Sequence, residues 1–126
     1  MTVQADTLPT RWQVEFQAGE HRGVADTAKL GVGGAGGLRP HELLEAALAT
    51  CMTITARIWL AEQSISDDGV AVAVQVVRHD DASRFQYRLV LPEPLEIYRS
   101  QITERLEQSP VRTTLSKNLT FEPVAA

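Results

Sequence analysis

The segment from Leu43 to Leu60, LLEAALATCMTITARIWL, constrains the fold more than any other part of the sequence. Its residues are apolar or small around most of the circumference of a helix, and such a helix belongs inside a protein or a membrane. Glu45 and Arg57 leave only residues 46 to 56, a stretch of 11, free of charge. Because a membrane span needs about 20 apolar residues, we predict a buried protein helix and no membrane association.

Residues ahead of this segment mark where the helix begins. Pro40 suits the first helical position, and Glu42 and Glu45 place negative charge near the positive end of the helix dipole. A chain of 126 residues forms one domain, here 1–126, whose small sheets can cover one or two faces of the helix. The missing cover is most simply a second copy of the chain, so we expect a homodimer in which these helices pack together.

Alternating apolar residues predict strands on both sides of the helix. Trp12, Val14 and Phe16 alternate with polar residues, and this strand can pair with residues 21–26 as a hairpin. Five glycines between Gly31 and Gly37 predict a flexible loop. No Gly-Lys-Ser/Thr follows them, which argues against a nucleotide site.

A second hairpin is predicted after the helix. Its apolar positions are Val70, Val72, Val74 and Val76 on the first strand and Phe85, Tyr87, Leu89 and Leu91 on the second. An amphipathic helix over residues 95–108, a short helix over 110–115 with Ser109 as N-cap, and a last strand over 118–121 complete the order. Strands grouped apart from helices indicate the α+β class.

Charge and cysteine content exclude several functions. The formal net charge is −4, with no run of Lys or Arg, so we expect no nucleic-acid partner. One cysteine excludes an intrachain disulfide and a cysteine-rich zinc site. His21 and His41 have no third ligand at metal-site spacing, so we expect neither metal nor cofactor. The first residues lack the apolar core of a signal peptide, and a cytoplasmic location is the expectation.

The start of the long helix carries a recognisable motif, Pro-x-Glu-Leu-Leu-x-x-Ala-Leu-x-x-Cys. It is formed here by Pro40, Glu42, Leu43, Leu44, Ala47, Leu48 and Cys51. With the Ser-Pro-Val sequence from Ser109, it resembles the OsmC/Ohr family (osmotically inducible protein C and organic hydroperoxide resistance) over roughly residues 11–122. The resemblance implies an intertwined homodimer, with β-hairpins around two central helices and active sites at the interface.

The resemblance also implies a thiol chemistry. In peroxide-reducing members a first cysteine, at the position of Cys51, attacks the hydroperoxide and becomes a sulfenic acid. A second cysteine then condenses with it to a disulfide and so protects it from irreversible overoxidation. Ser109 stands at that second position here. Because a hydroxyl cannot form a disulfide, an external thiol would have to resolve the sulfenic acid.

Three residues at the helix start are candidate neighbours of the thiol. They are Arg39, His41 and Glu42. Strongly peroxidatic members have Glu directly after the proline, where this chain has His41. Ten residues of one helix span about 15 Å, so a helper here would reach the Cys51 of a partner chain or act through the substrate.

Two functions stay open on the sequence. The first is a one-cysteine reductase of organic hydroperoxides in oxidative-stress defence. The second is a non-catalytic relative that binds a small apolar or acyl ligand at the dimer interface. On local sequence alone, Cys51 is a small core residue and Ser109 a helix cap.

Overall fold

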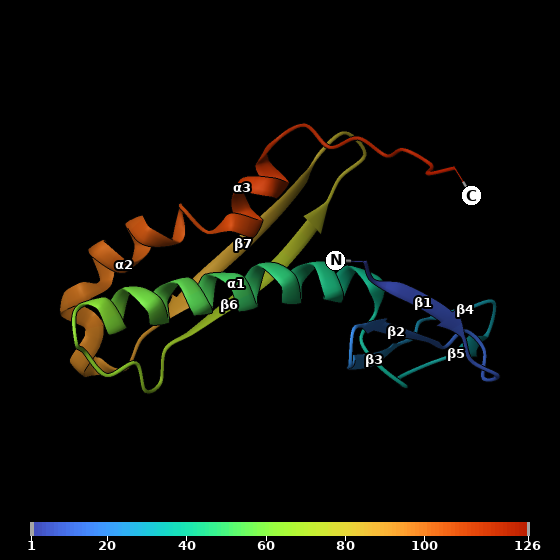
Figure 1. The fold of residues 1–126 in the computed structure, drawn as a ribbon, viewed down its shortest axis with the longest axis horizontal. Helices are drawn as coiled ribbons and strands as arrows, with labels where there is room; N and C mark the ends of the chain where they lie inside the picture. The colour runs from blue at the N-terminus through green and yellow to red at the C-terminus, as the bar shows by residue number, and fades with distance from the viewer. Residues whose placement is uncertain (1, 126) are drawn as a thin grey trace. The chain divides into compact units, whose positions relative to one another are not determined.

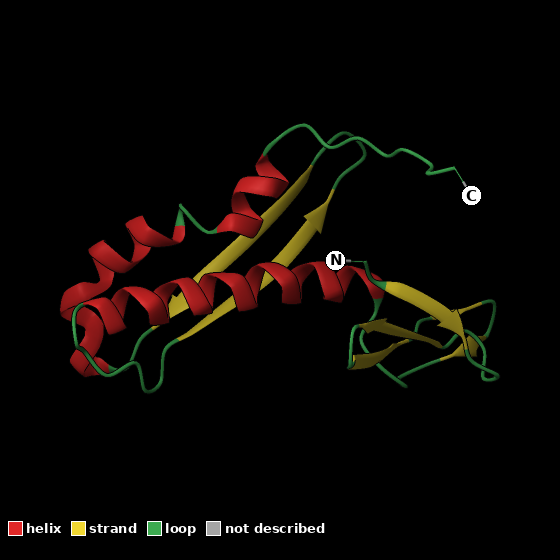
Figure 2. Cartoon of the chain, in the orientation of Figure 1, coloured by secondary structure: helices red, strands yellow, loops and turns green. Residues whose placement is uncertain are grey.

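The computed structural model describes residues 2–125, which form two compact units, one up to Leu44 and one from Glu45 onward. The first unit holds five short strands, and helices with one hairpin make up the second (Figure 2). This segregation confirms the predicted α+β class.

The first unit is built from short antiparallel strands. They are β1 (Gln4–Thr7), β2 (Val14–Ala18) and β3 (His21–Ala25), in sheet order β1-β2-β3, and the two-stranded pair β4 (Ala28–Lys29) and β5 (Val32–Gly33). The predicted hairpin of β2 and β3 is confirmed, with Val14 opposite Ala25. Strand β1 was not predicted because its sequence, QADT, has no apolar alternation and all four residues are exposed.

The glycine-rich segment is more ordered than its composition predicts. Asp26 is buried beneath it, with 4% of its surface exposed, and accepts hydrogen bonds from the N–H groups of Gly36 (3.0 Å) and Thr27 (2.8 Å). The bond from Gly36 is the main cause that lowers the pKa of Asp26 from its ordinary value of 3.8, against the opposing effect of burial. A Cβ at Gly37 would overlap the carbonyl group of Val24, so only glycine fits there.

The long helix α1 (Pro40–Glu62) begins at Pro40 as predicted and includes the whole apolar run to Leu60. Its buried residues recur every four positions, as Leu48, Met52, Ala56 and Leu60, and form one face toward the core of the second unit. By length and composition alone α1 is apolar enough to cross a membrane. Core helices of soluble proteins pass the same test, and α1 buries one of its faces in the core of the second unit.

The second unit packs a hairpin and three helical segments against α1. These elements are β6 (Ala71–Arg78), β7 (Ser83–Val90), the 3-10 helix η1 (Glu93–Tyr98), α2 (Arg99–Leu106) and α3 (Pro110–Ser116). Figure 1 shows α1 in green beside the hairpin, with α2 and α3 in orange. Val72 of β6 lies opposite Leu89 of β7, and both are buried against α1 with Ile102 of α2. This confirms the predicted core face at Val72 and Leu89, whereas Tyr87, predicted on the same face, is 37% exposed and lies outside the core.

Two sequence expectations for the C-terminal part need correction. The predicted helix over 95–108 is divided into η1 and α2, although its apolar positions Leu95, Ile102 and Leu106 are buried as expected. The predicted strand over 118–121 is wrong, since this segment has no strand conformation and Phe121 is 91% exposed.

A carboxylate ties the hairpin to the long helix. Oε2 of Glu45 accepts a hydrogen bond of 2.8 Å from the backbone N–H of Val76 in β6. An unpaired N–H at a strand edge is a site for unwanted strand pairing, so this contact protects the edge of β6 while fixing the hairpin to α1.

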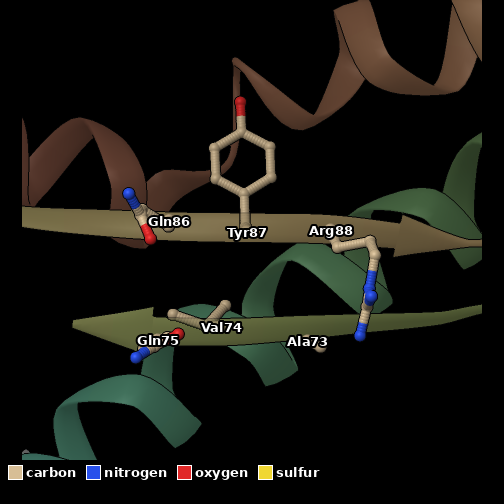
Figure 3. A pocket seen from close by; sticks show the side chains of 6 residues that line it. All are labelled: Ala73, Val74, Gln75, Gln86, Tyr87 and Arg88. Carbon is tan, nitrogen blue, oxygen red and sulfur yellow. The ribbon is translucent and has the colours of Figure 1, made fainter. Parts of the chain in front are cut away.

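The outer face of the hairpin carries a shallow hollow of about 290 Å³ (Figure 3). Gln75, Gln86 and Arg88 surround it, and Tyr87 rises from β7 away from these side chains. The lining holds no cysteine, serine, histidine or carboxylate. Its polar side chains are the amides of Gln75 and Gln86, the guanidinium of Arg88 and the phenol of Tyr87.

Candidate functional site

A thiol and a buried hydroxyl meet in the second unit. Ser109 Oγ donates a hydrogen bond of 3.0 Å to Sγ of Cys51, which is a free thiol. Ser109 has 0% of its surface exposed, whereas Cys51 is half-buried. The two positions that the family motif relates therefore lie in direct contact in this chain.

The turn between α2 and α3 aims the hydroxyl at the sulfur. Ser109 N–H donates to the carbonyl of Leu106 (3.0 Å), and Ser109 C=O accepts from the N–H of Thr113 (3.0 Å). Pro110 then takes the first position of α3. Ser109 thus occupies the predicted N-cap position, although its hydroxyl makes no cap hydrogen bond. The sulfur of Cys51 is its acceptor instead.

On α1, the thiol lies at the border between the buried face and an exposed apolar face. We call the exposed residues Ala47, Ile54, Ile58 and Ala61, together with half-buried Cys51, the open face of α1. Their positions follow one another at intervals of 4, 3, 4 and 3, the heptad spacing at which two helices pack. Ile54 and Ile58 are 53% and 51% exposed. An exposed apolar stripe of this kind is typical of a surface that contacts another protein.

A groove runs beside the open face. It has a volume of about 330 Å³ and is lined by residues of α1 together with Val72. Arg57 borders the groove, but its guanidinium is paired with Asp67. This pairing raises the pKa of Arg57, mainly through the hydrogen bond from its side chain. The charge of Arg57 is thus paired with the carboxylate of Asp67 and not with the thiol of Cys51.

The predicted neighbours at the helix start belong to the first unit. Oε1 of Glu42 accepts a hydrogen bond of 2.8 Å from the backbone N–H of Arg39, so Glu42 serves as the carboxylate of a capping box. His41 lies in the first turn of α1, between Pro40 and Glu42. The structure thus brings Cys51 together with Ser109, while Arg39, His41 and Glu42 as neighbours of the thiol stay a prediction.

No set of three metal-ligating side chains gathers anywhere in residues 2–125. The hydrogen bond from Ser109 to Cys51 gives the site a sulfur with a hydroxyl donor on it. This hydrogen bond holds the sulfur at the border between the buried face and the open face of α1.

Comparisons with known proteins identify the family of this chain. A family model described as OsmC-like protein matches residues 33–124. No curated protein matches. The chain belongs to the OsmC-like family.

Solved structures share the fold at low identity. A Psychrobacter arcticus protein described as an osmotic stress induced and detoxification response protein has 18% identity and a TM-score of 0.73, over 90% of this chain and 87% of its own. An OsmC-like protein from Mycoplasma pneumoniae has 16% identity and a TM-score of 0.67, over 90% and 85%. An organic hydroperoxide resistance protein OsmC from Legionella pneumophila has 17% identity and a TM-score of 0.62, over 93% and 89%.

Proposed function

We propose that this protein reduces organic hydroperoxides with Cys51 as its single catalytic thiol. The observation that carries the proposal is the hydrogen bond from the buried hydroxyl of Ser109 to the sulfur of Cys51. A thiolate is the nucleophilic form of cysteine and accepts hydrogen bonds more strongly than a thiol. The buried donor holds the sulfur of Cys51 in a fixed position, and the Legionella structure belongs to a protein named for hydroperoxide resistance.

The reaction balances with an external thiol. The thiolate of Cys51 attacks the terminal oxygen of the hydroperoxide, the O–O bond breaks, and the alkoxide takes up a proton and leaves as an alcohol. The sulfenic acid of Cys51 then condenses with an external thiol, forming a mixed disulfide and releasing water. A second external thiol attacks that disulfide, restores the Cys51 thiol and leaves as the oxidised disulfide. Ser109 does not change its covalent state in any of these steps.

A homodimer through the open face of α1 is part of the proposal. The open face combines heptad spacing with two isoleucines that are each more than half exposed. Cys51 lies within it, so a second α1 packed there would close the thiol off from bulk water on one side. A water-poor site also strengthens the hydrogen bond from Ser109 to the sulfur.

The second candidate function is binding of a small apolar or acyl ligand at the dimer interface without catalysis. Two observations favour it: Ser109 cannot resolve a sulfenic acid, and the groove of about 330 Å³ beside the open face is lined largely by apolar or small residues. A cysteine half-buried among such residues also serves as a packing residue.

Trapping the intermediate separates the two functions. Protein treated with one equivalent of an organic hydroperoxide and a sulfenic-acid reagent should gain the reagent's mass at Cys51, and Cys51→Ser should gain none. With a small dithiol present, the protein should consume hydroperoxide catalytically. Binding of apolar ligands without any oxidation of Cys51 would favour the non-catalytic function.

A further inference from the structure

A cavity between α1, β7 and α3 has no part in the proposed reaction. Its volume is about 170 Å³, and its lining comes from all three elements. Leu48 is contributed by α1, Phe85 by β7, and Arg112, Leu115 and Ser116 by α3. Neither Cys51 nor Ser109 lines it.

Most of the cavity wall is apolar. Leu48 is 2% exposed and lies in the core. Phe85 of β7 and Leu115 of α3 are half-buried and also line the cavity. Ser116 is exposed, and its hydroxyl donates to the carbonyl of Thr113. An apolar cavity of roughly 150 Å³ is large enough for benzene, so this one suits a chain or ring of about six carbon atoms.

Among the described residues that line this cavity, Arg112 is the one that is charged. Arg112 is half-buried, and its Nη1 donates to the backbone carbonyl of Glu107 at 3.1 Å. No carboxylate of residues 2–125 forms an ion pair with it. A guanidinium has five N–H donors in a planar fork that matches a carboxylate. Arg112 thus keeps donors for an anion at the edge of an apolar space.

We propose that this cavity binds a small amphiphile with one carboxylate and an apolar chain of about six carbon atoms. The carboxylate pairs with Arg112, and the chain packs against Leu48, Phe85 and Leu115. This site lies within one protomer and does not use the thiol, so it is independent of the proposed reaction.

Titration of the isotope-labelled protein with hexanoate, hexanol and acetate, followed by NMR, tests the proposal. Hexanoate should bind at least about tenfold more tightly than either comparison molecule, because it alone has both the charge and the chain. Amide signals of Phe85 and Leu115 should shift most. Arg112→Gln should weaken hexanoate to the level of hexanol and leave hexanol unchanged, whereas Arg112→Lys should retain part of the preference.

Arg88→Gln is the matched control, since Arg88 is an exposed arginine that lines the hollow on the hairpin's outer face. This variant should bind hexanoate as the wild type does. Unchanged hexanol binding by Arg112→Gln shows that the cavity is intact in that variant. The proposal is overturned if hexanol binds as tightly as hexanoate, if Arg112→Gln keeps full hexanoate affinity, or if the shifts centre on Ile54 of the open face.

Discussion

Ser109 and Cys51, 58 residues apart in the chain, are joined by a hydrogen bond of 3.0 Å from hydroxyl to sulfur. The hydroxyl is fully buried and makes no cap hydrogen bond to α3, and its acceptor is the sulfur of Cys51. A serine thus stands in the place from which a second cysteine could attack the oxidised sulfur, and it donates a hydrogen bond instead.

Restoring a second cysteine should create a disulfide. Because the Ser109 side chain already points at Cys51, Ser109→Cys should form a bond between the two sulfurs after treatment with an organic hydroperoxide. Intact-mass analysis should find the loss of two hydrogens, and turnover with a dithiol should rise. Overoxidation of Cys51 in this variant, without disulfide formation, would mean that the two side chains do not come together in solution.

Glu45 should contribute to stability through its contact with β6. Glu45→Ala leaves the half-buried N–H of Val76 without its acceptor, and should lower the free energy of unfolding by about 1–3 kcal/mol. Glu45→Gln keeps an acceptor oxygen and should lose less. Urea unfolding measures both, with Glu104→Ala on the exposed surface of α2 as the control. Equal stability of Glu45→Ala and Glu104→Ala would contradict the role assigned to Glu45.

Acid should release the glycine-rich segment of the first unit. The pKa of Asp26 is lowered in the folded state, so the carboxylate stabilises the fold at neutral pH. That stabilisation is complete well above the ordinary value of 3.8 and is lost as the pH falls through the lowered folded pKa. Hydrogen exchange at the amide of Gly36 should accelerate over this range.

Asp26→Asn is the comparison for the acid effect. An amide cannot be protonated in this range and offers one acceptor oxygen in place of two. The variant should therefore exchange faster at Gly36 at neutral pH and show no further change on acidification. Wild-type exchange that stays constant through the acid range, once corrected for the intrinsic rate, would show that Asp26 does not hold the segment.

A charge on the open face should prevent self-association. Ile58→Glu places a carboxylate in the middle of the proposed helix pair and should convert a dimer to a monomer in light scattering at micromolar concentration. Ile97→Glu is the control, because Ile97 is 77% exposed on η1 and lies outside the open face. A wild-type protein that is already monomeric would contradict the proposed interface.

The elements with strong periodic patterns were predictable from the sequence. Pro40 and the apolar run after it placed α1, and the alternation around Val72 and Leu89 placed the core face of the second hairpin. Strand β1 is held by pairing with β2 rather than by apolar side chains, so its sequence carries no signal. The segment 118–121 has an apolar pattern but no neighbouring strand to pair with.

The candidate site was predictable only in part. The family motif related Cys51 to position 109, but a serine before a proline usually caps a helix. The direction of its hydroxyl depends on how α3 packs beside α1, which no local pattern records. Arg112 was missed for the same reason, since an arginine in a short helix shows no sequence signal of the cavity beside it.

The rate at which Cys51 reacts with an organic hydroperoxide tests the central claim most directly. Stopped-flow measurement at neutral pH should give a second-order rate constant well above that of free cysteine. Ser109→Ala, which lacks the donor, should be slower by about tenfold, equivalent to one hydrogen bond of about 1.4 kcal/mol. A wild-type Cys51 that reacts no faster than free cysteine, with Ser109→Ala unchanged from it, would contradict a catalytic thiol and favour ligand binding as the function of this protein.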